Sequence, residues 1–262
     1  MDLAFAVVET VISVADLHRS YGAVEAVRGV TFSVARGEIF GLLGPNGAGK
    51  TTILETLEGL RPVQRGQVTV NGVDIARDPY RVRRMVGVQL QQAAFFDHLN
   101  LEELLRLFGE LYETGADPAA LLELVGLEQR GRSLAKKLSG GQRQRFSIAT
   151  ALVNDPSVIF LDEPTSGLDP QARRRLWRIV RSLRERLKTV VLTTHYIEEA
   201  EALCDRVGIL DEGRLIALDS PRNLVRELLG RGFKSEVEVV PATLEDVYLD
   251  LTGRAIRDEE EG

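Results

Sequence analysis

Gly44-Pro45-Asn46-Gly47-Ala48-Gly49-Lys50-Thr51-Thr52 is the stretch that decides the fold of this chain of 262 residues. It matches G-x-x-x-x-G-K-S/T, a P-loop whose backbone N–H groups cradle nucleotide phosphates. The glycines leave those N–H groups uncovered and permit positive φ, and the helix that follows presents its N-terminus to the anion. Lys50 would hold the β- and γ-phosphates, and the Thr51 hydroxyl would bind Mg²⁺. The alternative, a glycine-rich turn that matches by chance, would rarely reproduce the whole pattern.

A second pair of motifs indicates which kind of nucleotide-binding protein this is. Residues 138–142 read LSGGQ, and the apolar segment 158–161, typical of a buried strand, ends in Asp162-Glu163. Ser139 and Gln142 have capping-box spacing, so Ser139 can begin a helix whose N-terminus, with its bare glycine N–H groups, attracts anions. Alone, these motifs also read as a helix cap and a turn. Downstream of a P-loop, they resemble the ATPase subunits of ABC transporters over residues 11–219.

The resemblance implies ATP and Mg²⁺ as cofactors, together with a set of site residues. The nucleotide-binding residues it implies are Tyr21, Gly44, Pro45, Asn46, Gly47, Ala48, Gly49, Lys50, Thr51, Thr52, Ser139, Gly140, Gly141, Gln142 and Asp169. The metal ligands it implies are Thr51, Gln91 and Asp162. The catalytic residues it implies are Glu163, as general base on the attacking water, with His195, Lys50 and Gln91. In this family LSGGQ closes on ATP held by another subunit, which implies an ATP-dependent head-to-tail homodimer.

Four of these residues have structural alternatives. Tyr21, expected to stack on adenine, could instead pack a turn, and a lone histidine after a strand, such as His195, is usually structural. Gln91 best matches the glutamine that joins the nucleotide to the helical subdomain, but Gln89 and Gln92 leave that register open by about a residue. Asp169 also reads as a helix N-cap before proline, and both roles can hold.

Composition and charge restrict the class of protein. The chain is 44% hydrophobic and 27% charged, which is ordinary for a globular domain, and its net charge of −6 argues against a nucleic-acid partner. A single cysteine, Cys204, excludes an internal disulfide and fits a reducing compartment. The first residues lack the basic region of a signal peptide. No apolar run approaches the ~20 residues that span a bilayer. If the chain is part of a transporter, as the resemblance implies, the membrane path belongs to another chain: a separate transmembrane permease subunit is expected, with this chain in the cytoplasm, peripheral to the inner face of the cell membrane.

The order of predicted elements indicates an α/β fold. Alternating apolar residues predict half-buried strands at 11–17 and 30–34, and a continuous apolar run predicts a buried strand at 39–43. A helix at 50–60 follows the P-loop, and Asn71-Gly72 predicts a hairpin turn. Further strands are predicted at 158–162, 190–194 and 207–210, separated by helices at 170–187 and 196–203. The expected fold is a P-loop NTPase core, a mixed sheet with flanking helices, plus an antiparallel N-terminal β-subdomain and an inserted α-helical subdomain.

The expected domain organisation has three parts. Residues 1–10 are an N-terminal extension, residues 11–220 form the ATPase domain, and residues 221–262 are a short C-terminal segment with a frayed acidic tail. The helical subdomain occupies about residues 92–157. Its first helix shows a helical apolar stripe, made by Leu101, Leu104, Leu105, Phe108 and Leu111. A second stripe lies at 121–125, and a third helix follows LSGGQ.

Two segments bear on the type of transporter. Phe95, Phe96 and Leu99, rimmed by polar residues, predict an exposed patch that receives a membrane subunit, with core packing of either ring as the alternative. Residues 241–254 resemble the ending of the daunorubicin-resistance-like ATPases of drug and antibiotic exporters, although an amphipathic helix with Leu244, Val247, Tyr248 and Leu251 on one face could give the same pattern. Residues 231–240 are shorter than the accessory domain usual there.

The favoured function is therefore ATP hydrolysis by an ABC-type, Mg-dependent ATPase that powers a separate membrane subunit. Export of drugs, antibiotics or other small hydrophobic compounds is the first expectation. An importer ATPase and a soluble ABC ATPase with a non-transport role are the alternatives. The intact Glu163 disfavours a module that only binds nucleotide. The transported substrate does not follow from these residues, because its pocket would lie in the partner.

Overall fold

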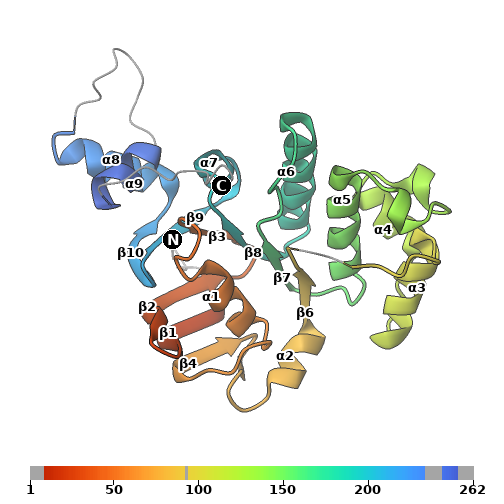
Figure 1. Cartoon of the computed structure of the whole chain (residues 1–262), viewed down its shortest axis with the longest axis horizontal. Coiled ribbons are helices and arrows are strands. Elements are labelled where there is room, and N and C mark those ends of the chain that lie inside the picture. The colour runs from red at the N-terminus through yellow and green to blue at the C-terminus, as the bar shows by residue number, and fades with distance from the viewer. Residues whose placement is uncertain (1–8, 92–93, 234–243, 253–262) are drawn as a thin grey trace, which may run out of the picture.

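Two β-sheets organise the chain, with helices packed around them (Figure 1). The computed structural model describes residues 9–91, 94–233 and 244–252. Residues 1–8 of the expected extension, the segment 234–243 and the acidic tail lie outside the described residues. The expected α/β class with two unlike sheets is what the structure shows.

The larger sheet has six strands in the order β10-β9-β3-β8-β7-β6. Five of them are parallel, and only β10 pairs antiparallel, with β9. The strands are β3 (Ile39–Leu43), β6 (Val86–Gln89), β7 (Val158–Asp162), β8 (Thr189–Thr194), β9 (Arg206–Asp211) and β10 (Arg214–Asp219). Because the central strands are parallel, the loops that follow β3, β7 and β8 gather at one edge, where ligands bind in open α/β sheets.

Both faces of this sheet are covered, which explains why β3 reads as a continuous apolar run. Ile39 and Leu43 belong to the core on one face, and Phe40 and Leu42 belong to the core on the other. Gly41 lies between them, because a Cβ there would stand 2.6 Å from the Sγ of Cys204. The predicted bounds of this strand are confirmed.

The smaller sheet is antiparallel, in the order β2-β1-β4-β5. Its strands are β1 (Thr10–Tyr21), β2 (Val24–Ala35), β4 (Arg65–Val70) and β5 (Val73–Asp74). The predicted hairpin at Asn71-Gly72 is confirmed, since both residues have positive φ, 48° and 75°, as a two-residue turn of this kind requires. The sheet encloses the second core together with α1 (Lys50–Leu57) and one face of the larger sheet.

The other face of the larger sheet carries most of the helices (Figure 1). These are α5 (Gly140–Ala151), α6 (Pro170–Glu185), α7 (Ile197–Leu203), α8 (Pro221–Gly230) and α9 (Leu244–Thr252). Leu244, Val247 and Tyr248 are buried in this core, so the amphipathic reading of the C-terminal stripe is confirmed for the described residues. No helix in the described ranges is long and apolar enough to span a membrane.

The helical insertion contains α3 (Leu101–Leu111) and α4 (Pro118–Leu124) beside α5, with short 3₁₀ turns at Glu128–Arg130 and Ala135–Lys137. Its helices begin at residues whose side chains cap them, namely Asn100, Asp117 and Ser139. The predicted stripe is wrong at its last position, because Leu111 is 69% exposed at the end of α3.

The predicted apolar docking patch is also partly wrong. The Phe95 ring packs edge-on against buried Phe146, with centroids 4.9 Å apart, and Leu99 packs against the same core. Only Phe96 of the three is exposed, at 60%. The alternative of core packing therefore holds for Phe95 but not for Phe96.

Several boundaries and elements differ from the prediction. The helix after the P-loop ends at Leu57 because Gly59 takes a positive φ of 72°, and α6 ends at Glu185, just before Leu187 with φ of 60°. The strands β6 and β10 and the helices α8 and α2 (Pro79–Met85) were not predicted. The short helix α2 leads directly into β6 and places the residues that follow beside the P-loop.

Candidate nucleotide site

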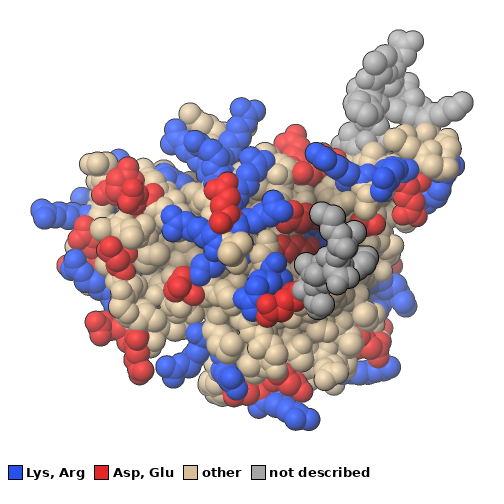
Figure 2. Space-filling view, turned by 180° about the vertical axis from the view of Figure 1, so that it is seen from behind, with Lys and Arg blue, Asp and Glu red and all other residues tan. Residues whose placement is uncertain are grey.

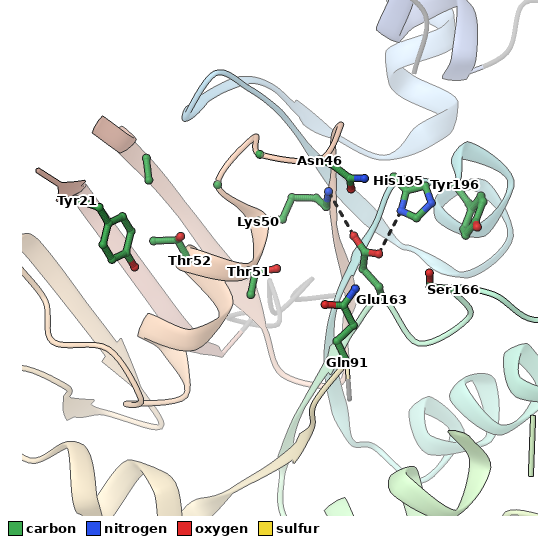
Figure 3. Close-up of a pocket in the computed structure, with 13 residues that line it drawn as sticks. Tyr21, Asn46, Lys50, Thr51, Thr52, Gln91, Glu163, Ser166, His195 and Tyr196 are labelled. Carbon is green, nitrogen blue, oxygen red and sulfur yellow. Dashed lines mark ion pairs between the residues drawn. The ribbon is translucent and has the colours of Figure 1, made fainter. Parts of the chain in front are cut away.

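A pocket of about 700 Å³ lies beside the P-loop, at the edge where the parallel strands end (Figure 3). Residues that follow β3, β7 and β8 all contribute to it, as the sheet topology requires. Its lining residues are Tyr21, Ala26, Asn46, Gly47, Gly49, Lys50, Thr51, Thr52, Gln91, Glu163, Ser166, His195 and Tyr196. Most of the sequence-predicted site residues therefore meet in one place.

Two P-loop glycines are required by the backbone around them. Gly49 has φ of 98°, and a Cβ there would stand 2.4 Å from the carbonyl oxygen of Ala26. A Cβ on Gly44 would stand 2.3 Å from the carbonyl oxygen of Leu210. The loop is thus pressed against β2 and the end of β9, which fixes the direction of its N–H groups at the start of α1.

Lys50 is 4% exposed and reaches back across the loop. Its Nζ donates to the carbonyl oxygens of Gly44 at 2.9 Å and Pro45 at 3.0 Å, and it lies 3.5 Å from Oε1 of Glu163. Burial lowers the pKa of Lys50, and the carboxylates of Glu163 and Asp162 oppose that shift. The side chain is therefore a positive charge held at a fixed point among P-loop carbonyls.

Asp162 is buried at the end of β7 and is held by two hydroxyl groups. Thr193 Oγ1 donates to Asp162 Oδ1 at 2.5 Å, and Thr51 Oγ1 approaches the same oxygen at 3.4 Å. Burial raises the pKa of Asp162, while the Thr193 hydrogen bond lowers it and the Glu163 charge raises it further. The two motifs predict that Thr51 and Asp162 lie close together. The hydrogen bond from Thr193 to Asp162 was not predicted from the sequence.

Glu163 stands at the centre of the pocket. Its backbone has a positive φ of 44°, unusual for a residue with a side chain, and its N–H donates to Thr193 Oγ1 at 2.9 Å. Figure 3 shows Lys50 and His195 approaching its carboxylate from two sides, with Nδ1 of His195 3.3 Å from Oε2. The His195 hydrogen bond holds the pKa of Glu163 below its ordinary value, burial opposes this, and the Lys50 charge adds to it. Glu163 is therefore ionised at neutral pH.

Gln91 and Tyr21 lie at different ends of the pocket (Figure 3). Gln91 points toward Glu163 from the segment after β6, while Gln89 is buried within β6 and donates to the Leu90 carbonyl oxygen at 2.6 Å. Gln92 lies outside the described residues. Tyr21 is 39% exposed, and the guanidinium of Arg19 lies 5.0 Å from its ring centroid. The guanidinium of Arg61 also lies 5.7 Å from this centroid, so the partly exposed ring stands at the pocket edge among positive charges.

The LSGGQ segment lines a second hollow of about 310 Å³ that shares no lining residue with the first. Ser139 caps α5, since its Oγ accepts from Gln142 N–H at 3.4 Å and its N–H donates to Gln142 Oε1 at 3.0 Å. Asp169 lies across the hollow and caps α6 by accepting from Ala172 N–H at 2.8 Å. Both predicted caps are confirmed, and the structure does not bring this hollow and the P-loop pocket together within one chain.

The donors near the P-loop fit a hard cation that also uses phosphate and water ligands. Thr51 and Asp162 bring a hydroxyl and a carboxylate oxygen to one point, and oxygen ligands are those that Mg²⁺ prefers. No group of three or more His, Cys, Asp or Glu side chains suited to a metal occurs in the ranges described. A dedicated all-protein metal cage is thus not present among the described residues, and the P-loop arrangement does not require one.

Comparison with known proteins places these features in a family. A family model described as ABC transporter matches residues 27–166. The chain is 39% identical over 220 residues to the linearmycin resistance ATP-binding protein LnrL of Bacillus subtilis (strain 168), covering 82% of this chain and 71% of that protein. It is 42% identical over 227 residues to the daunorubicin resistance ATP-binding protein DrrA3 of Streptomyces coeruleorubidus, covering 85% and 72%. It is 44% identical over 232 residues to a Nod factor export ATP-binding protein I of Ralstonia nicotianae, covering 84% and 70%.

Solved structures show the same fold. An ATP-binding subunit of an ABC transporter superposes with a TM-score of 0.79 at 33% identity, covering 93% of this chain and all of that one (100%). The ATP-binding cassette MJ0796, in a dimeric post-hydrolysis state bound to ADP and phosphate, superposes with a TM-score of 0.73 at 26% identity, covering 80% of this chain and 98% of that one.

Proposed function

The chain belongs to the ABC transporter family as an ATP-binding, ATP-hydrolysing subunit, and from this premise we propose that it powers a separate membrane subunit that exports drugs, antibiotics or other small hydrophobic compounds. One observation carries the proposal at the site: Lys50 and His195 converge on an ionised Glu163 beside the P-loop. The relatives named for linearmycin resistance, daunorubicin resistance and Nod factor export support the direction of transport. The chain would work in the cytoplasm, against the inner face of the membrane.

We assign the chemistry to residues as follows. The P-loop N–H groups and Lys50 bind and stabilise the phosphates, and Thr51, Asp162 and Gln91 would hold Mg²⁺, which supplies positive charge to the phosphate oxygens. Glu163 accepts the proton of the attacking water, since its carboxylate is ionised and faces the pocket. His195 orients Glu163 through the contact at Oε2. Tyr21 stacks on the base of the nucleotide at the open end of the pocket.

The two separate hollows favour a dimer. Anions bind at helix N-termini, and the N-terminus of α5 with Ser139, Gly140 and Gly141 lines a hollow that the P-loop of the same chain does not reach. A second copy, turned head to tail, would set its nucleotide against this hollow and beside Asp169. The dimeric form of MJ0796 supports this arrangement.

The Glu163→Gln variant tests the proposed catalytic arrangement. The amide keeps the size of the side chain and loses its basicity, so ATP should bind while turnover falls by about 10²–10⁴-fold. Trapped ATP should then hold two copies together, which size-exclusion chromatography with Mg-ATP would show. The wild type run without nucleotide is the matched control. A variant that binds ATP normally but elutes as a monomer would contradict the sandwich arrangement.

Phe96 is the proposed anchor for the membrane subunit. Its ring is 60% exposed on the segment that joins the Gln91 side of the pocket to the helical insertion, beside exposed Asp97 and His98. Phe96→Ala should weaken capture of the membrane subunit by ~2 kcal/mol or more while leaving the melting temperature unchanged. Tyr80→Ala is the matched control, because Tyr80 is 73% exposed on α2. If Phe96→Ala and Tyr80→Ala captured the membrane subunit equally well, Phe96 would not be part of the interface.

A further inference from the structure

One face of α6 carries a dense set of arginines. Four exposed side chains, Arg174, Arg175, Arg178 and Arg181, follow the helical repeat along the outer surface and form the α6 arginine face. Figure 2 shows the result from behind, where blue side chains gather at the upper centre of the molecule over this helix. For a chain with a net charge of −6, such a concentration of positive charge is unexpected.

Most of this charge is not neutralised by neighbouring carboxylates. Other arginines of α6 do have partners, as Arg173 pairs with Glu198 at 3.7 Å and Arg184 with Asp205 at 2.7 Å. Arg174, Arg175 and Arg178 form no ion pair with any carboxylate in the described part of the chain. Arg145 lies beside Arg175, and both line the same hollow. Burial lowers the pKa of Arg145, and repulsion from the Arg175 charge lowers it further.

The shape of the face suits a peptide chain rather than a flat surface. Arg175 and Arg178 form a ridge between two hollows, one of about 440 Å³ along α6 and one of about 380 Å³ toward the end of α4. Trp177 lines the first hollow and is fixed there by its indole N–H, which donates to Glu199 at 3.0 Å. Guanidinium groups pair with carboxylates through two parallel hydrogen bonds, so an extended acidic segment matches this surface.

The chain itself contains such a segment, Asp258-Glu259-Glu260-Glu261, which lies outside the described residues. Helices α6 and α9 flank α7 at adjacent residues, because Arg181 donates to the Ala202 carbonyl oxygen and Leu244 N–H donates to the Glu201 carboxylate. A helix as short as α9 is about 14 Å long, and the six residues from 253 to 258, where the acidic run begins, can span about 20 Å when extended. The acidic run therefore has the length to return to α6.

We propose that residues 258–261 bind to the α6 arginine face of their own chain. Four carboxylates would then lie against four guanidinium groups, none of which has an ion pair among the described residues. The contact is ionic and solvent-exposed, so it is reversible and sensitive to salt.

If the proposed function holds, binding of residues 258–261 to the α6 arginine face would affect formation of the dimer. Arg175 also lines the LSGGQ hollow, where the nucleotide of a second copy would approach. Carboxylates held on the face would repel those phosphates, so the bound tail would oppose closure of the dimer. Release of the tail would favour it.

The chain offers its own probe for the contact. Trp177 is its one tryptophan and lies in the arginine hollow, and Cys204 is its one cysteine and is buried. A Gly262→Cys variant can therefore carry a nitroxide quencher beside the acidic run. We expect roughly half of the Trp177 fluorescence to be lost at low ionic strength and recovered in roughly 0.5 M NaCl, where charges are screened within a few ångströms.

Two labelled variants give the controls. Arg174→Gln with Arg178→Gln should abolish the quenching, whereas Arg81→Gln with Arg84→Gln, which removes two exposed charges from α2, should leave it unchanged. Quenching that is absent in the parent, or that persists in the α6 double variant, would overturn the proposal. So would binding of vesicles containing phosphatidylglycerol through Arg174 and Arg178 without any quenching, because the face would then be a lipid site.

The effect on the dimer is measured separately. Replacing residues 258–261 by their amides, Asp258→Asn with Glu259→Gln, Glu260→Gln and Glu261→Gln, should lower the protein concentration at which Mg-ATP produces the dimer by about threefold or more, since carboxylates near the phosphates are removed. An unchanged concentration with quenching intact would refute the consequence for the dimer and leave the tail contact standing. Loss of ATP-dependent dimerisation in every variant would refute the proposed function instead.

Discussion

Thr193 holds the Asp162 carboxylate and the Glu163 backbone at the end of the sheet, and its replacement by valine separates that role from simple packing. Its side chain is fully buried at the end of β8. The hydroxyl accepts from the Glu163 N–H at 2.9 Å and donates to Asp162 Oδ1 at 2.5 Å. Valine has nearly the same shape, so Thr193→Val removes these two hydrogen bonds and little else.

The structure sets the size of the effect. A buried N–H without a partner costs ~1–3 kcal/mol, and a hydrogen bond to a carboxylate is worth ~1.5–3 kcal/mol, so the free energy of unfolding should fall by roughly 2.5–6 kcal/mol. The Thr193 hydrogen bond also lowers the pKa of Asp162 against the effect of burial. Without it that pKa rises, so fewer Asp162 side chains are ionised at a given pH. The loss of activity should therefore be largest on the acidic side.

Thr189→Val supplies the matched control at the other end of the same strand. Thr189 is 1% exposed, and its hydroxyl accepts from the Gly37 N–H at 2.9 Å, far from the pocket. Urea unfolding should show a loss of stability in both variants. Mg-ATPase rates measured from about pH 5.5 to about pH 9 should fall, with an acidic limb moved to higher pH, only in Thr193→Val. Identical rates and pH profiles in the two variants would refute a positioning role for Thr193.

Three further predictions follow from the site and its surroundings. Lys50→Ala should reduce phosphate release by ~10²-fold or more, because a fixed charge on the phosphates is removed, and an unchanged rate would contradict the assignment. Gly141→Asp should abolish ATPase activity but keep ATP affinity, and mixing it with Lys50→Ala protein should restore part of the rate if the hollow acts across the dimer. Burial, with the charges of Asp162 and Glu55, raises the pKa of Glu58 from 4.5 to about 8, so the wild type should lose stability as pH rises from 4.5 to about 8. This fall in the free energy of unfolding should amount to at most roughly 5 kcal/mol, and it should be absent in Glu58→Gln. Chemical unfolding measured at each pH would show the difference.

The fold was predictable wherever burial left a clear pattern. β3 reads as an apolar run because both of its faces are covered, and the hairpin at Asn71-Gly72 was given by turn chemistry. Strand β10 was not predicted because it is a half-buried edge strand without a clear alternation of apolar and polar residues. The turn before it could have been recognised, since Glu212 and Gly213 both take positive φ and a Glu-Gly pair allows such a hairpin turn. Asp78-Pro79 and Ser220-Pro221 are also N-cap and N1 pairs, so α2 and α8 could have been found.

For the candidate site, the sequence predicted which side chains would gather beside the P-loop, but not how they contact one another. The motifs supplied Lys50, Asp162 and Glu163, since each chemistry needs its residue type at a strand end or helix start. Thr193 was not predicted because a β-branched residue in a buried strand is ordinary. Only the pairing of β7 with β8, which sets Thr193 opposite Asp162, brings its hydroxyl to the site. The exposure of Phe96 and the burial of Phe95 could not be separated, because two adjacent rings in a loop have no period to read.

Lys50, Asp162 and Glu163 are charged side chains that are nearly buried beside the P-loop, and their mutual contacts offset the cost of burying them. Lys50 lies within 3.5 Å of Glu163 and hydrogen-bonds to P-loop carbonyl oxygens, so its charge is compensated without any ligand. A phosphate that reaches Lys50 competes with Glu163 for the same ammonium group. If Glu163 is the general base, as proposed, losing the Lys50 attraction would raise the pKa of its carboxylate and so its basicity, while the His195 contact at its other oxygen would oppose that rise. On that proposal, exchange of the Lys50–Glu163 ion pair for a Lys50–phosphate contact would make the carboxylate a better base once ATP is bound.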